Sequence, residues 1–177
     1  MQKIRRAMSR ELAMALQARE HLGPGGFAAV AQLVADLRKI KRRIEDRAQA
    51  LGYSARCRQA IPTCAGECCR RHFPRTINRV DFLIALFGSS AAERKALVKK
   101  LQAVDLSHQC PLLRADGCIL SFANRPMVCT NAFPCFAGED YWRYKETFRD
   151  NIEDTRAALN RLINMEPAGD RVTSSTG

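Results

Sequence analysis

The apolar positions of the chain recur at helical spacing over much of its length. From Phe27 onward they follow one another three or four positions apart, at Val30, Leu33, Val34, Leu37, Ile40 and Ile44. This period is typical of one buried helix face, and Leu51 with Gly52 marks the expected end of that helix. A helical run from Ser9 to Leu22 precedes it, and Gly23-Pro24-Gly25-Gly26 between the two predicts a turn. Residues 1–52 therefore predict an N-terminal helical hairpin.

Three further helices are expected, and no strand of useful length. Asn78 with Asp81 predicts the start of a helix over residues 79–87 that Gly88 closes. Ser90 followed by Glu93 matches a capping box, which predicts a helix running to about Val104. A last helix is expected over residues 139–165, with Tyr141, Tyr144, Phe148 and Ile152 on one face as core. The tail, residues 166–177, is polar and is expected to be disordered.

All eight cysteines fall in the part of the chain between these helices, in two groups. The first group is Cys57, Cys64, Cys68 and Cys69, and the second is Cys110, Cys118, Cys129 and Cys135. Both segments are punctuated by proline and glycine, which predicts irregular loops. The expected fold is therefore mostly α, with helices framing two cysteine-rich metal-binding loops. Residues 53–138 form the cysteine-cluster region, and the helix over 139–165 packs on the same domain.

Soft-metal ligation is the leading interpretation of these cysteines. Thiolates are the preferred ligands of zinc and of iron–sulfur clusters, and all eight cysteines are candidate ligands. No signal-peptide pattern or membrane-spanning run follows the charged N-terminus, so we expect a cytoplasmic protein. Disulfides are rare in that reducing compartment. A four-disulfide scaffold would become the better interpretation if the chain were secreted.

The cysteines and their neighbours carry a family resemblance. The segments are Cys64-Ala-Gly-Glu-Cys68-Cys69, Cys110-Pro111-Leu112-Leu113, Cys118, Arg125-Pro126-Met127-Val128-Cys129 and Phe133-Pro134-Cys135. Over about residues 57–136 the chain resembles the YkgJ-type cysteine-cluster proteins, a zinc- or iron-chelating domain with a CxxCxxCC signature. The spacing departs from that pattern, since three residues separate Cys64 from Cys68, and Thr130 replaces a usual basic residue. The resemblance implies bound iron or zinc, and some members are described as Fe–S oxidoreductases.

The choice between the two metals depends on spacing. Zinc sites usually show paired short Cys-x2-4-Cys knuckles, and the second group has none. The vicinal pair Cys68-Cys69 suits a polynuclear cluster, because adjacent side chains diverge. We therefore expect an iron–sulfur cluster, [4Fe–4S] in type, with Zn2+ as the alternative. Arg125 is a candidate to donate hydrogen bonds to the cofactor or to an anion, and a surface arginine before a turn is the competing interpretation.

The formal charge of +11 adds a second class of function. The second helix is expected to carry an outward basic face of Arg38, Lys39, Lys41, Arg42, Arg43 and Arg47, interrupted by Glu45 and Asp46. A solvated helix face is favoured over a nucleic-acid patch, since no nucleic-acid motif accompanies it. The first hypothesis is thus a metal-binding protein with an electron-transfer or redox role and an unidentified protein partner. The alternative is a zinc-stapled module that binds nucleic acid or an acidic protein. No catalytic residue can be named.

Overall fold

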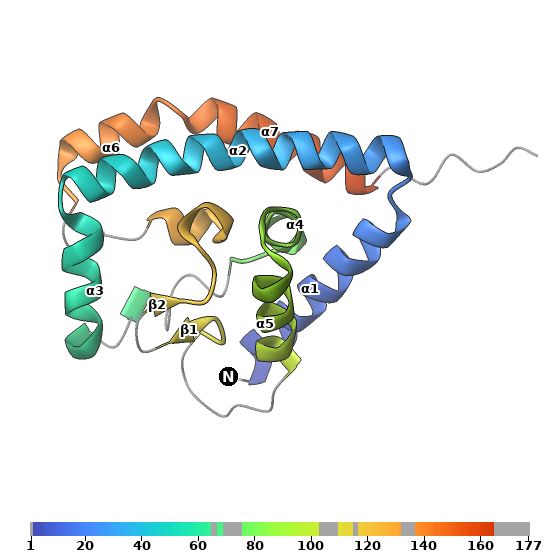
Figure 1. The fold of residues 1–177 in the computed structure, drawn as a ribbon, viewed down its shortest axis with the longest axis horizontal. Helices are drawn as coiled ribbons and strands as arrows, with labels where there is room; N and C mark the ends of the chain where they lie inside the picture. The colour runs from blue at the N-terminus through green and yellow to red at the C-terminus, as the bar shows by residue number, and fades with distance from the viewer. Residues whose placement is uncertain are drawn as a thin grey trace, which may run out of the picture.

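The computed structural model describes residues 2–64, 67–68, 76–102, 110–114, 117–131 and 137–164. Within these ranges the chain is mostly helical, which confirms the expected fold class (Figure 1). The α-helices are α1 (Gln2–His21), α2 (Pro24–Ala50), α3 (Tyr53–Cys64), α4 (Arg79–Gly88), α5 (Ala91–Gln102), α6 (Glu139–Glu146) and α7 (Arg149–Asn164). Two 3-10 helices, η3 (Phe122–Asn124) and η4 (Met127–Asn131), and two short strands, β1 (Leu113–Arg114) and β2 (Gly117–Cys118), lie between α5 and α6.

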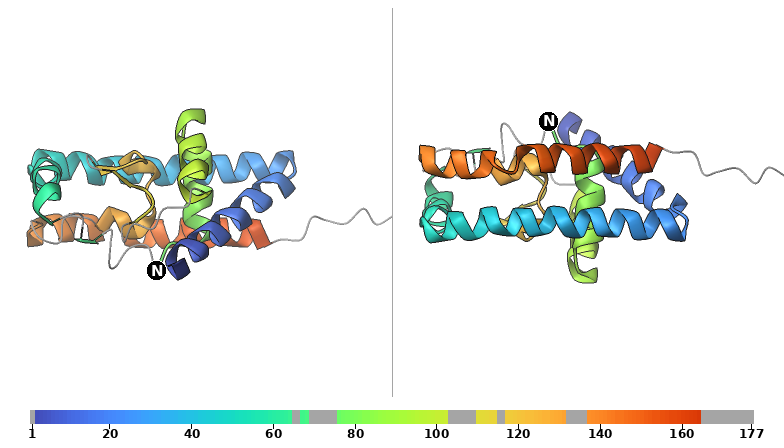
Figure 2. Two further views of the ribbon diagram at one scale, coloured as in Figure 1. Left: turned by 90° about the horizontal axis from the view of Figure 1, so that it is seen from below. Right: turned by 90° about the horizontal axis from the view of Figure 1, so that it is seen from above.

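The long helix α2 and the pair α6–α7 run side by side in opposite directions (Figure 2). Helix α4 crosses this layer and contacts α1, α2, η3 and α7. Helix α1 folds back from the start of α2 to cover α4 and α5 on the other side (Figure 1). The arrangement buries α4 at the centre of the molecule.

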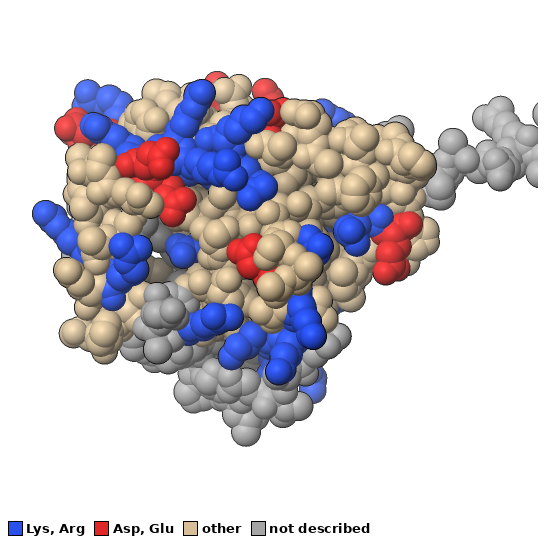
Figure 3. All heavy atoms as spheres, in the orientation of Figure 1, with Lys and Arg blue, Asp and Glu red and all other residues tan. Residues whose placement is uncertain are grey.

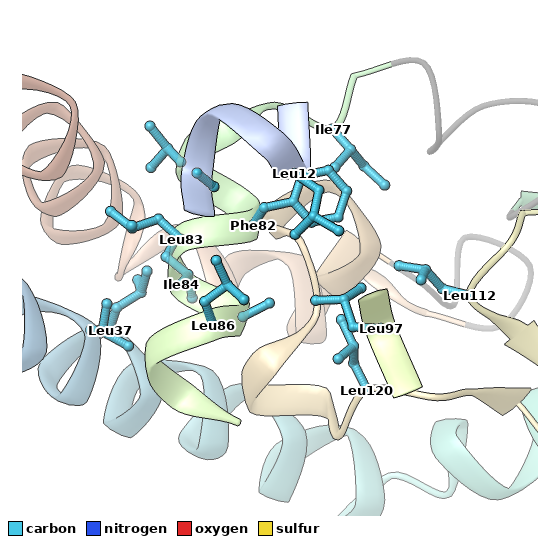
Figure 4. Packing of buried hydrophobic residues seen from close by; sticks show 14 of the residues in the cluster. Leu12, Leu37, Ile77, Phe82, Leu83, Ile84, Leu86, Leu97, Leu112 and Leu120 are labelled. Carbon is cyan, nitrogen blue, oxygen red and sulfur yellow. The ribbon is translucent and has the colours of Figure 1, made fainter. Parts of the chain in front are cut away.

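Burial of α4 explains its composition. Seven consecutive residues, from Val80 to Leu86, are buried, and all except Asp81 are apolar. A helix that is apolar on all sides needs neighbours on all sides, and these are supplied by Leu12, Leu37, Leu97, Leu112 and Leu120 (Figure 4). The core therefore draws on α1, α2, α4, α5 and the segment that carries the second cysteine group.

The predicted helix starts at Asn78 and Ser90 are confirmed by their capping contacts. The Asn78 side chain accepts hydrogen bonds from the Val80 and Asp81 amides, and Asp81 Oδ2 accepts from the Asn78 amide at 3.2 Å. The Ser90 hydroxyl and the Glu93 carboxylate exchange the same reciprocal pair with each other's backbone amides. Helix α5 ends at Gln102, near the predicted end.

Several predicted boundaries are wrong. Helix α1 begins at Gln2 instead of Ser9, and α2 begins at Pro24 instead of Phe27, because proline is well suited to the first helical position. The helix expected over 139–165 is broken, since α6 ends at Glu146 and the hydroxyl of the C-cap residue Thr147 donates to the Tyr144 carbonyl at 2.7 Å. Strands β1 and β2 pair antiparallel although none was expected, because two-residue strands are too short to show a periodic pattern.

Two further expectations concern membrane-spanning helices and the C-terminal tail. None of the helices within the described ranges is long and apolar enough to span a membrane. The tail predicted to be disordered, residues 166–177, lies outside those ranges.

Candidate metal centre

The first cysteine group begins in a helix. Cys57 and Cys64 belong to α3, although an irregular loop was expected there. Pro62 lies within the last turn of α3, where its nitrogen cannot donate a backbone hydrogen bond, and the helix ends two residues later at Cys64. Cys57 and Cys68 are partly buried and Cys64 is exposed, while Cys69 lies outside the described residues.

The second group lies on the irregular segment that packs into the core. Cys110 is buried just before β1, and Cys118 on β2 pairs with Leu113 on β1. Cys129 belongs to η4 and is partly buried. Cys57, Cys118 and Cys129 all pack against the hydrophobic core. Cys135 lies outside the described ranges.

Helix α3 and the segment that carries Cys118 and Cys129 both lie near the second half of α2 (Figure 1). Helix α3 follows directly from the C-terminus of α2 through Gly52, whose positive φ of 73° suits glycine at a helix end. Contacts with α2 are made by α3 and by η3, and Figure 1 shows β2 and the 3-10 segments on the side of the molecule where α3 lies. Tyr53 at the start of α3 accepts a hydrogen bond from the Gly138 amide and packs edge-on against Tyr141.

Among the residues that the structure describes, no three His, Cys, Asp or Glu side chains are close enough together to hold one metal ion. Cys69 and Cys135, together with His72 and His108, lie outside that part of the chain. The complete ligand set of eight cysteines therefore stays a prediction. What the structure does describe is how the segment bearing Cys129 is held in place.

A buried lysine anchors one end of that segment. Lys41 was expected on the outward basic face of its helix, which is wrong: its side chain is 0% exposed. It lies on the same stripe of α2 as Leu37 and Ile44, and its ammonium donates a hydrogen bond to the Arg125 carbonyl. Burying an ammonium is costly unless it is hydrogen-bonded and faces negative charge. The position of Lys41 is therefore a strong constraint on the Arg125 backbone.

A buried carboxylate anchors the next turn. Asp81 is 2% exposed, and its Oδ1 accepts a hydrogen bond from the Met127 amide at 3.1 Å. The same oxygen accepts from Arg156 Nη1 on α7 at 2.5 Å. Because Asp81 also completes the cap of α4, one carboxylate joins α4, α7 and the start of η4. The backbone two residues before Cys129 is thus fixed to two helices.

The electrostatics of this cluster favour negative charge near Cys129. Burial lowers the pKa of Lys41 to about 7, while the charges of Asp81 and Cys129 oppose that shift. When Lys41 is protonated, it and Arg156 carry two positive charges against the single carboxylate of Asp81. A thiolate at Cys129 would balance the remaining charge, and a nearby cation favours the thiolate over the thiol.

Both the side chain and the backbone of Arg125 contact other residues of the chain. Its Nε donates to the Leu120 carbonyl at 3.1 Å, and its guanidinium carbon lies 5.6 Å from the centre of the Phe122 ring. Its carbonyl takes the Lys41 hydrogen bond. These contacts show that Arg125 helps to hold the segment before Cys129 in place. Its predicted role toward a cofactor stays a prediction.

Sequence reasoning missed Lys41 as a site residue and assigned Asp81 only a capping role. The signal for Lys41 was its register, since it lies four positions after Leu37 and three before Ile44, on the apolar stripe. Nothing comparable pointed to Asp81, because its contacts with Met127 and Arg156 join residues far apart in sequence.

Comparisons of the chain with protein-family models, with curated proteins and with solved structures find no match.

Proposed function

We propose that the chain is a cysteine-ligated metal protein that holds an iron–sulfur cluster between its two cysteine groups. The observation that carries this proposal is the fixed position of Cys129. Its segment is tied down by buried hydrogen bonds at Arg125 and Met127, and the cation of Lys41 lies nearby. A metal site needs thiolates in a preorganised geometry.

The positions of the other cysteines support the same proposal. Cys57 on α3 and Cys118 on β2 are half-buried, as Cys129 is, and all three pack against the same hydrophobic core. Partial burial limits solvent access, which is one of the factors that set the potential of an iron–sulfur cluster. A cluster here would give the chain an electron-transfer role with an external redox partner. With Zn2+ in its place, the site would be structural.

The test is anaerobic purification of the full chain, followed by an absorption spectrum and analysis of iron, acid-labile sulfide and zinc. A brown protein that absorbs near ~400 nm and contains iron and sulfide is the expected result. Colourless protein with stoichiometric zinc would replace the iron–sulfur proposal with the zinc alternative. Colourless protein without bound metal would refute both.

A pair of variants connects the metal to the observed geometry. Cys129→Ser should lower the metal content, because a hydroxyl is a poor substitute for a thiolate ligand. Thr130→Ser is the matched control on the same segment, since it keeps the hydroxyl that donates to the Met127 carbonyl at 2.6 Å. Equal metal content in the two variants would show that Cys129 is not a ligand.

A further inference from the structure

Helix α3 carries Cys57 and Cys64 and is the least buried α-helix in the described part of the chain. None of its residues is buried, whereas each of the other described α-helices buries at least one side chain. These buried residues include Met8, Leu37, Leu83, Leu97, Tyr141 and Leu159, one from each helix. Helix α3 lies at the left edge of the molecule in Figure 1 and in the space-filling view of the same face (Figure 3). Because packing stability comes mainly from buried apolar surface, α3 is held less tightly than the other helices.

The contacts that hold α3 in place are found in its first half. Tyr53 and Cys57 are half-buried, pack against the hydrophobic core and lie four residues apart, on one face of the helix. The Tyr53 hydroxyl accepts a hydrogen bond from the Gly138 amide at 3.2 Å, and its ring centre lies 5.7 Å from that of Tyr141. At the other end of the helix, Cys64 is exposed. Tyr53 therefore ties the start of α3 to the start of α6.

A glycine joins α3 to the long helix before it. Gly52 has a positive φ of 73°, a conformation that glycine adopts without steric cost. Apart from its chain neighbours, no atom lies within 4 Å of the place where a side chain would begin, so no packed side chain borders it there. Helix α2 ends at Ala50 and α3 begins at Tyr53, so two regular helices meet at this point. Hinge movements are typically absorbed by a few residues of this kind between rigid elements.

We propose that α3 is a hinged arm, which opens about Gly52 while the rest of the domain stays folded and which admits metal to the cysteine site. This inference rests on the proposed function, because the arm carries two of the predicted ligands. In the closed position Cys57 packs on the same core as Cys118 and Cys129. A metal held by Cys57 together with either of those cysteines would tie the arm to the body of the domain, and its release would require the arm to open.

The opening is expected to be local, because it disrupts few contacts. A helix of 12 residues is marginal in water on its own, so α3 should fray once Tyr53 and Cys57 leave the core. Regions with few buried contacts open at a fraction of the free energy of global unfolding. Such an opening also exposes little surface, so it should respond only weakly to denaturant. Bound metal that requires the closed arm should make the opening rarer.

The first test measures alkylation of single thiols by iodoacetamide in the full chain, after metal has been removed with a chelator under reducing conditions. Peptide mass spectrometry separates the individual cysteines. The rate at Cys57 should hardly change between water and about 1 M urea. Cys110, which is buried in the core, should react at least about 100-fold more slowly, and its rate should rise with urea. Cys110 therefore reports global unfolding in the same sample.

The key variant is Tyr53→Leu, which removes the ring contact with Tyr141 and the hydroxyl that accepts from the Gly138 amide. It should speed the alkylation of Cys57 by at least about 5-fold and leave that of Cys110 unchanged. Tyr144→Leu is the matched control, because the Tyr144 ring makes a similar edge-on contact with Phe148, in which α3 takes no part. It should change the rate at Cys57 by less than about 2-fold.

The second test connects the arm to the metal. Transfer of the bound metal from the loaded chain to excess EDTA is followed for the unmodified chain and for both variants. Because release requires the arm to open, Tyr53→Leu should speed the transfer by the same factor of about 5, and Tyr144→Leu should leave it unchanged. Circular dichroism verifies that all three chains are folded.

Three outcomes would overturn the proposal. Equal alkylation of Cys57 in Tyr53→Leu and in the unmodified chain would show that this thiol is reached without movement of the arm. The same urea dependence at Cys57 and Cys110 would show that both are reached only by global unfolding. Metal release that Tyr53→Leu leaves unchanged would refute the arm while the proposed metal function stands. A chain that binds no metal would refute the proposed function and the gating role with it, whereas the alkylation rates would still decide whether α3 opens.

Discussion

Asp81→Asn should destabilise the protein more than any exposed aspartate substitution. The carboxylate is 2% exposed and accepts hydrogen bonds from Arg156, from the Met127 amide and from the Asn78 amide. Asparagine has the same shape but is uncharged, and it presents a donor where one oxygen accepted. Arg156 would then be left as a cation without its carboxylate, and the pKa of Lys41 would fall further because the Asp81 charge that raises it is gone.

The expected loss follows from these contacts. Removing one partner of a buried ion pair costs about 3–5 kcal/mol, and the Arg156 side chain is only 24% exposed. We therefore expect the free energy of unfolding to fall by about 3–4 kcal/mol, a large share of the ~5–15 kcal/mol typical of a folded domain. The melting temperature should fall by about 10 °C for a chain of this length.

Urea unfolding followed by circular dichroism measures this loss. Asp46→Asn on the exposed side of α2 is the control and should change the free energy of unfolding by less than about 0.5 kcal/mol. In an Arg156→Met background Asp81→Asn should cost at least about 1 kcal/mol less, because the two residues act as a pair. A loss below about 1.5 kcal/mol for Asp81→Asn alone would refute the assigned role of Asp81. The same conclusion would follow if the losses caused by Asp81→Asn and Arg156→Met simply added in the double variant.

Three further substitutions test separate features of the fold. Because burial places the pKa of Lys41 near 7, below its unfolded value of 10.5, the unfolded chain binds the extra proton between these values. The contribution of Lys41 should therefore increase the free energy of unfolding as pH rises from about 7 to 10, by at most about 1.4 kcal/mol per pH unit. Urea titrations at several pH values should show that Lys41→Met removes this increase. Gly88→Ala should cost about 1–3 kcal/mol, since its methyl group would overlap Asn124 Oδ1, whereas Gly25→Ala has open space and should cost nothing in the same denaturation assay. Ser90→Ala should cost about 1 kcal/mol in thermal melts through loss of the cap on α5, and an unchanged melting temperature would show that the cap contributes nothing.

Local signals predicted the starts of α4 and α5. The caps at Asn78 and Ser90 use side chains that reach only three residues along the chain, so the sequence pattern contains the whole interaction. The end of α2 at Leu51 and Gly52 is equally local. Where a neighbour in sequence decides the conformation, inspection of the chain is sufficient.

Predictions failed where distant contacts decide the outcome. The periodic pattern places Lys41 on the apolar stripe, yet a lysine is ordinarily assigned to solvent. It is buried because the Arg125 carbonyl and the charge of Asp81 satisfy it from other elements. Similarly, Pro62 and the nearby glycine indicated a loop around the first cysteines, but Cys57 packs against the core from a helix.

The sequence by itself determined that this protein is mostly helical, that its eight cysteines fall into two groups, and that it is strongly basic. These properties depend on residue type and short-range spacing. Only the tertiary structure showed that Lys41, Asp81 and Arg156 meet beside the Cys129 segment, and that Arg38 of α2 interacts with Glu93 of α5. The physical reason is the same in both cases: the free energy of a buried or clustered charge depends on partners that only folding brings near.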